Sequence, residues 1–191
     1  MSYTLKDVFY LGATHEYPHG TYGSAGIEGN IPIDVSAYVD PIAKGRTRGQ
    51  GLAVYKVHSH VAGNSTGGNQ INTDAGAANF GLSVKPYATS GDNSGALEVG
   101  DLACDSDLAI YLASFTALGT RAAGQGGGMT SEVYLEPSAD VPYVVVRDTI
   151  FSIMSSSTAI GADIITSYRM ECAMISLDTA TLNQLLRTQT A

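Results

Sequence analysis

All four histidines of the chain fall into two close pairs, and each pair has a spacing that occurs in metal sites. His15 and His19 lie four residues apart with Glu16 directly after the first, as in the zinc-binding helix of a zinc protease. His58 and His60 are separated by one residue, so on a strand both side chains project from the same face. Whether either pair does metal chemistry depends on the element that holds it.

The first pair lacks the helix that a zinc protease needs. Pro18 stands between Glu16 and His19, and proline disfavours a helix through this segment. The surrounding residues are rich in Gly and Tyr, which suits a loop. We therefore expect no protease chemistry from His15 and His19.

The second pair resembles the start of the first cupin motif, and the resemblance is limited to a few residues. Gly51 lies roughly where that motif has a glycine, but no glutamate follows His60 and no PxG…H motif occurs downstream. We expect His58 and His60 to lie beside Lys56 on the polar face of a half-exposed strand. Metal ligation by this pair is the weaker alternative, and we expect no zinc, iron or manganese at any of the four histidines.

Other catalytic motifs are absent from the sequence. It has no GxSxG elbow, no Walker loop and no CxxC, and GQGGG at 124–128 lacks the strand–turn–helix context of a phosphate loop. Cys172 alternates with Tyr168 and Met170, which predicts a buried free thiol. Pairing with Cys104 stays open, because it requires neighbouring strands. We expect no enzymatic activity and no cofactor.

The elements that would position these residues are mainly strands. Apolar and polar residues alternate through 140–154 and again through 163–177, and a short polar loop joins the two runs, which predicts an antiparallel hairpin. Residues 105–119 fit a strand or a short helix equally well. Further strand candidates, separated by Gly, Asn, Asp and Ser clusters, are 51–61, 80–89 and 132–137.

The pattern as a whole predicts a mainly β chain that forms a single-domain β-sandwich, a jelly roll with long Gly/Ser/Asn-rich loops. Residues 46–178 would form the sandwich, residues 1–45 an extended N-terminal arm, and residues 179–191 a C-terminal tail or short helix. A surface loop region is the alternative to the arm. The aromatic residues expected to bury the arm against neighbouring copies are Tyr3, Phe9, Tyr10, Tyr17, Tyr22 and Tyr38.

The composition argues against nucleic-acid binding and favours a building block. Lys plus Arg total 10 against 18 Asp plus Glu, giving a net charge of −8, and the one basic cluster is Lys44, Arg46 and Arg48. No apolar run is long enough for a transmembrane helix, and the first residues do not form a signal peptide. Only 15% of the residues are charged, which keeps desolvation costs modest when copies bury large surfaces.

The irregular N-terminal segment, the short strands with long loops, and the closing runs YVVVRDTIFSIM and DIITSYRMECAMISL resemble a known family. They are similar to the single jelly-roll capsid proteins of tailless icosahedral viruses with an internal membrane. The resemblance covers residues 45–178 and is architectural, so no functional residues are carried over. It implies a structural virion protein that self-assembles as a homo-oligomer into a capsid shell. Its partners would be copies of itself and a second coat protein, above a membrane and without direct contact with nucleic acid.

Two other function classes remain open. The chain could be a subunit of a filament or tube, such as a phage tail tube or an extracellular fibre, because these favour a similar composition. It could also be a cupin-like or carbohydrate-binding β-domain that uses His58 and His60.

Overall fold

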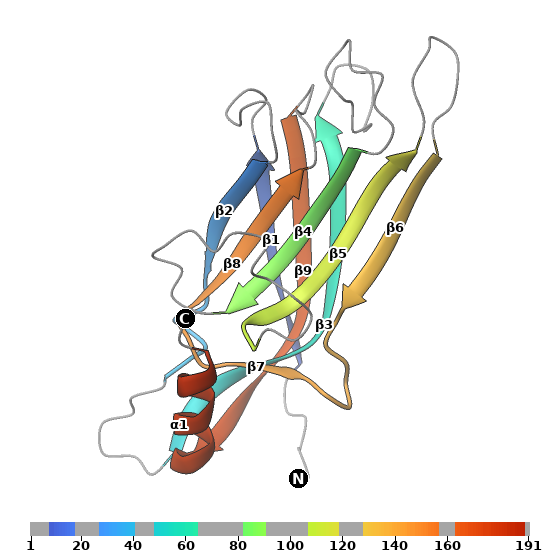
Figure 1. Cartoon of the computed structure of the whole chain (residues 1–191). Helices are drawn as coiled ribbons and strands as arrows, with labels where there is room; N and C mark the ends of the chain where they lie inside the picture. Colours follow the sequence, from blue (N-terminus) through green and yellow to red (C-terminus); the bar gives the residue numbers. More distant parts are fainter. Residues whose placement is uncertain are drawn as a thin grey trace.

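The computed structural model describes residues 8–17, 27–40, 48–64, 82–90, 107–118, 128–156 and 163–189. Within these ranges the protein is mainly β, with antiparallel sheets and one short helix. The elements are β1 (Phe9–Tyr17), β2 (Ile27–Asp34), β3 (Arg48–Asn64), β4 (Leu82–Ser90), β5 (Ala109–Leu118), β6 (Gly128–Leu135), β7 (Tyr143–Val145), β8 (Thr149–Ser156), β9 (Asp163–Asp178) and α1 (Thr179–Thr188) (Figure 1).

The strands form two sheets. Sheet A has the order β1-β9-β3-β7, and sheet B has the order β2-β8-β4-β5-β6. In Figure 1 the strands β1, β9 and β3 lie behind those of sheet B. β9 is hydrogen-bonded along both edges, since it pairs with β1 on one side and with β3 on the other.

One hydrophobic core draws side chains from both sheets. On β9 every second residue from Thr166 to Cys172 is buried, so this face of sheet A points into the core. Burying a side chain such as Leu or Ile contributes about 1.5–3 kcal/mol, which makes this shared core the main source of stability. Its most deeply buried apolar members are Val35, Leu52, Val54, Ile110, Ala113, Val145, Ile150, Met170 and Cys172.

A bulge at Tyr55 divides the opposite face of sheet A into two parts. The ladder between β3 and β9 passes from Val54 opposite Cys172 to Lys56 opposite Glu171, so Tyr55 is an extra residue. On one side of the bulge this outer face is buried, and Tyr55 clusters with Ala53 and Ala173. On the other side Lys56, His58 and His60 of β3 are exposed.

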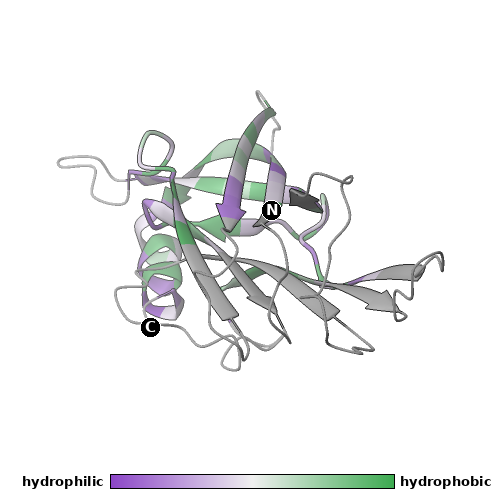
Figure 2. Cartoon of the chain, turned by 90° about the horizontal axis from the view of Figure 1, so that it is seen from above, coloured by the Kyte–Doolittle hydropathy of each residue, from purple (hydrophilic) through white to green (hydrophobic). Residues whose placement is uncertain are grey.

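α1 packs against the buried part of the outer face. Asp178 caps the helix, because its carboxylate accepts a hydrogen bond from the Thr181 N–H at 2.8 Å. Leu182 of the helix clusters with Leu177 of β9. Apolar and polar residues alternate along α1, and Figure 2 shows them as green and purple parts of the helix. β3 accommodates this helix with glycine, since a Cβ at Gly49 would lie 2.6 Å from Leu182 Cδ2.

The side chain of Gln189 takes the place of a neighbouring strand along β7. Its Oε1 accepts a hydrogen bond from the Val146 N–H at 3.3 Å, and its Nε2 donates to the Val144 carbonyl at 2.6 Å. The amide therefore forms the donor–acceptor pair that a strand would offer. β7 is only three residues long. Gln189 provides hydrogen-bond partners on the edge of β7 that is not paired with β3.

The predicted hairpin of residues 140–154 and 163–177 is wrong. The first run is divided between β7 and β8, and β8 pairs with β2 and β4 in sheet B, whereas β9 belongs to sheet A. Alternation identifies the buried face of a strand but not its partner.

Residues 1–45, expected as an arm, contribute two strands to the sheets. β1 pairs with β9, and β2 pairs with β8. The alternation of β1 is hard to recognise in sequence, because its inward positions include the small Ala13 and the polar His15. Elsewhere, residues 105–119 contain the strand β5 rather than a helix, and residues 179–188 form the helix that was one of two alternatives.

Glycine at position 51 should be required for packing rather than for backbone conformation. A Cβ there would lie 2.9 Å from Leu177 Cδ1 and 3.2 Å from the Val145 carbonyl oxygen. We expect Gly51→Ala to lower the free energy of unfolding by about 1–3 kcal/mol through overpacking, measured by urea denaturation. The control is Gly12→Ala, whose Cβ meets only the Tyr168 carbonyl at 3.7 Å and should be neutral or slightly stabilising. If the two variants were equally stable, the predicted steric crowding at position 51 would be wrong.

Candidate functional site

The polar and titratable side chains with the best chance of acting together lie on the exposed part of the outer face of sheet A. We call this surface the polar face. In the register of the ladder, Lys56 lies opposite Glu171, His58 opposite Arg169, and His60 opposite Ser167. Its members are Lys56, His58 and His60 of β3, Ser167, Arg169 and Glu171 of β9, and Tyr10, Thr14 and Glu16 of β1.

His58 contacts a carboxylate on this surface. Its Nε2 lies 3.1 Å from Glu171 Oε1, a diagonal contact between β3 and β9. The two side chains remain 48% and 31% exposed, so water screens the interaction. An exposed contact of this kind contributes at most about 1 kcal/mol to stability.

Arg169 links β9 to the edge strand β1. Its guanidinium carbon lies 4.0 Å from the centroid of the Tyr10 ring, a cation–π contact. Next along the same pair of strands, the Thr14 hydroxyl donates to Ser167 Oγ at 3.3 Å. These contacts cross the polar face and attach β1 to sheet A. The side chains involved therefore interact with one another.

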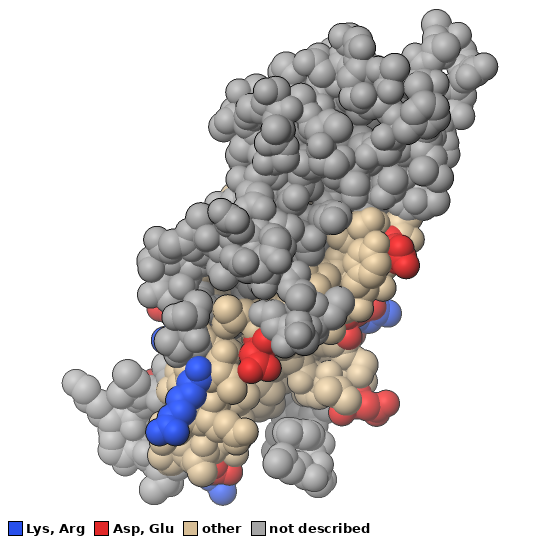
Figure 3. Space-filling view, in the orientation of Figure 1, with Lys and Arg blue, Asp and Glu red and all other residues tan. Residues whose placement is uncertain are grey.

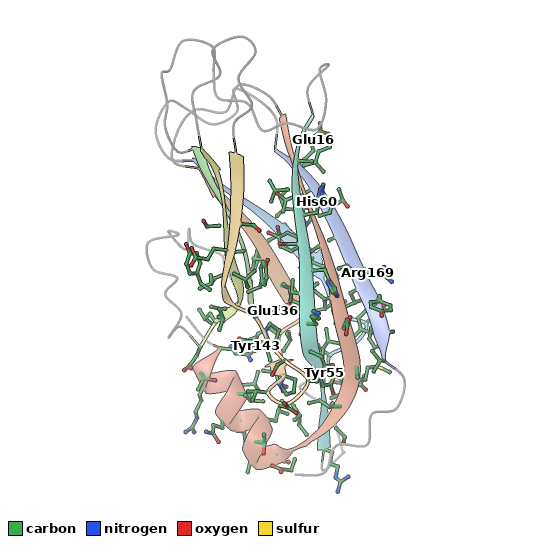
Figure 4. All side chains as sticks on the ribbon, turned by 90° about the vertical axis from the view of Figure 1, so that its right-hand side faces the viewer. Glu16, Tyr55, His60, Glu136, Tyr143 and Arg169 are labelled. Carbon is green, nitrogen blue, oxygen red and sulfur yellow. The ribbon has the colours of Figure 1, made fainter. Side chains whose placement is uncertain are left out.

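His58 and His60 do share one face of β3, as alternate residues must, and both are exposed. Figure 4 labels His60 and Glu16 toward one end of the sheet and Arg169 farther along. In the part of the chain that the structure describes, no group of three or more His, Cys, Asp or Glu side chains is placed to hold a metal ion. His58 and Glu171 offer two donors where a zinc site takes three or four protein ligands.

His15 lies on the other side of sheet A. It is next to Glu16 on the strand β1, so the two side chains point to opposite faces, and the arrangement of a zinc-protease helix is not formed. Nε2 of His15 is buried and has no hydrogen-bond partner within the described ranges. Burial lowers the pKa of His15, because the charged imidazolium is poorly solvated there. His19 lies outside the described residues.

Of the aromatic residues expected at an interface, those whose side chains the structure describes do not share one surface. Phe9 and Tyr38 stack with ring centroids 5.0 Å apart and pack against the core of their own chain. Tyr10 points the other way and lies under Arg169. Tyr17 ends β1, and Tyr3 and Tyr22 lie outside the described ranges.

Cys172 is a free thiol in the core, as the alternation of its strand predicts. Desolvation raises its pKa to about 12. The thiol is therefore protonated at neutral pH and unreactive, because the thiolate is the nucleophile and the metal ligand. Cys104 belongs to a segment that the structure does not describe.

Two features were missed by sequence reasoning. The sequence places Gln189 in a tail or short helix and indicates no role for it. In the structure its side chain completes the hydrogen bonding of residues 144 and 146. β6 was identified only as a short strand, yet residues 131–134 are exposed in succession on both faces. Residues 131–134 are Ser, Glu, Val and Tyr, which give the strand no apolar face. This pattern could have indicated an edge strand.

Comparison with known proteins adds no family assignment. No protein-family model matches the sequence, and no curated protein is significantly similar to it. No helix within the described ranges has the length and hydropathy needed to cross a bilayer.

The buried position of His15 predicts a pH-dependent stability. The unfolded chain takes up a proton near the ordinary pKa of 6.5, whereas burial lowers the pKa in the folded state. Below 6.5 the unfolded state thus binds more protons, and stability falls as the pH falls. We expect His15→Leu to lose less stability than the wild type between about pH 7.5 and about pH 5.5, measured by urea denaturation. His60→Leu on the exposed face is the control, and an equal effect of the two variants would contradict the assignment.

The arrangement of the histidines also predicts that the purified protein carries no stoichiometric zinc, iron or manganese. His15 and His58 lie on opposite sides of sheet A, so they cannot share an ion. Elemental analysis of the wild type and of the His58→Ala/His60→Ala double variant tests this. One metal per chain in the wild type, lost in the double variant, would overturn the expectation.

Proposed function

We propose that this chain is a structural subunit that self-assembles into a viral capsid shell and has no catalytic activity of its own. We further propose that its two sheets form a jelly-roll β-sandwich. Its partners are then other copies of itself and a second coat protein, and it belongs to the virion.

The observation that carries this proposal is the nested pairing of the strands. β1 pairs with β9, β2 with β8, β3 with β7, and β4 with β5, so the first strand meets the last and the pairing closes inward. A long antiparallel hairpin that is rolled up gives this order. It is the order expected of a jelly roll, an architecture of eight strands and two Greek keys found in capsid proteins.

The core supports the sandwich part of the proposal. Leu52 and Met170 come from sheet A, Ile110 and Ile150 come from sheet B, and all four belong to one cluster. β6 is then an added strand between the fourth pair and β7, because it extends sheet B beyond β5.

The surface supports a subunit more than an enzyme. The described part of the face in Figure 3 is mostly uncharged, with isolated Lys, Arg, Asp and Glu side chains and no basic patch. Large contacts between copies desolvate few charges on such a surface. The net charge of −8 also disfavours contact with a genome, which fits a coat that is separated from nucleic acid by a membrane.

The cupin-like alternative is less well supported. A ligand site inside a β-barrel or sandwich needs inward side chains, whereas His58 and His60 are exposed on the outer face of sheet A. The His58 imidazole is also in contact with the Glu171 carboxylate. A jelly roll alone does not specify a function, so assembly must be tested directly.

Negative-stain electron microscopy of the purified full chain, with sedimentation velocity at increasing concentration, tests the proposal. We expect closed or curved shells, formed alone or with a second coat protein from the same source. Fibres or tubes would favour the filament alternative. Particles no larger than a monomer or dimer under all conditions would overturn self-assembly.

A further inference from the structure

The edge of β7 that faces away from β3 is covered by the C-terminal end of the chain. In sheet A, β7 is the last strand beside β3, and α1 lies next to it in Figure 1. Gln189 bonds to Val144 and Val146, which are two residues apart. Residues two apart direct their backbone groups to the same edge of a strand. The helix end therefore occupies the place where a further strand of sheet A would lie.

The amide of Gln189 makes the two hydrogen bonds that one residue of an added strand would make. Its Nε2 donates to the Val144 carbonyl at 2.6 Å, and its Oε1 accepts from the Val146 N–H at 3.3 Å. A residue of a parallel strand bonds in this way to the two residues that flank its partner. Because Gln189 is only 2% exposed, the contact is enclosed and no other chain can reach these two backbone groups.

The end of α1 holds this amide in position. The backbone N–H of Gln189 donates to the Leu185 carbonyl at 2.9 Å, which fixes the point from which the side chain extends. Arg147, the next residue along the edge, donates from its guanidinium to the Leu186 carbonyl at 3.4 Å. A positive charge at the last carbonyls of a helix is favourable. The edge and the helix end thus hold each other.

The surface beneath α1 is apolar. Val146 is fully buried and clusters with Leu177 of β9 and Leu182 of the helix, and Val144 packs against the same cluster. Without α1 this region would present an apolar face next to backbone groups that lack partners. An edge of that kind is a template for pairing with another chain.

The helix depends on this contact for its own structure. α1 has ten residues, and isolated helices shorter than about 12–15 residues are marginal in water. A helix that leaves the sheet therefore also loses its helical structure. The edge of β7 is covered when α1 is docked and open when it is not.

We infer that α1 and Gln189 form an intramolecular block that prevents β7 from pairing with a strand of another chain. This inference goes beyond the proposed function and does not depend on it, because the block acts in a monomer as well as in a shell subunit. In the purified protein, the strand available to an opened edge belongs to a second copy of this chain.

Gln189→Leu tests the block, because it keeps a side chain of similar size and removes both hydrogen bonds to the edge. We expect this variant to self-associate at a concentration about tenfold or more below that of the wild type, measured by sedimentation velocity on the full chain. The matched control is Gln184→Leu, the same substitution at an exposed position of the same helix. Equal association of the two variants overturns the inference.

Hydrogen exchange shows whether β7 is the contact. In dilute Gln189→Leu protein, the amide of Val146 should exchange faster than in the wild type, because it has lost its acceptor. In concentrated protein the exchange should slow again as another strand covers the edge. Association without this recovery at residues 143–147 places the contact elsewhere and overturns the inference.

Gln189→Ala repeats the test with a smaller side chain and serves if the leucine variant does not fold. Its control is Gln184→Ala, and urea denaturation measures the stability of each variant. Lower stability of the Gln189 variants without self-association would show that Gln189 only supports the fold, which overturns the block. Shells formed by the wild type bear on the proposed function, whereas the comparison of variants at positions 189 and 184 bears on the block.

Discussion

The fold depends on one constraint, which is that β9 must satisfy hydrogen bonds along both edges while burying one face. All of its 16 residues pair with β3 on one side, and residues 164–172 pair with β1 on the other. Buried backbone groups without partners are costly, so β9 can cross the core only with both neighbours in place. Met170 and Cys172 then point into the core, while Arg169 and Glu171 point away from it. One strand thus defines both the core and the polar face.

The Tyr55 bulge lets the same face of sheet A change character along its length. On one side of the bulge the outward residues are polar and interact with one another. On the other side glycine and alanine on β3 leave room for Leu177 and for Leu182 of α1. The helix in turn brings Gln189 to the edge of β7. A local change of register therefore determines where the C-terminal helix packs and which sheet edge it protects.

The titratable side chains of the described residues do not converge on one site. The histidines are separated by the sheet, with His15 inward and His58 outward, and Glu171 occupies His58. The thiol of Cys172 is protonated and enclosed. The described part of the surface in Figure 3 carries few charges.

The sequence by itself determined that the chain is mainly β and how single residues are oriented on its recognisable strands. Strand patterns located β3, β4 and β9, put Cys172 in the core, and put His58 and His60 together on a polar face, whereas the segment of β5 stayed open between strand and helix. Only the tertiary structure decided which strands pair. It separated β8 from β9, and it showed that residues 9–17 and 27–34 are strands of the sheets. The physical reason is that side-chain direction follows from the two-residue period of the strand itself. The partner of a strand depends on the path of the loops and on the burial of residues far apart in the chain.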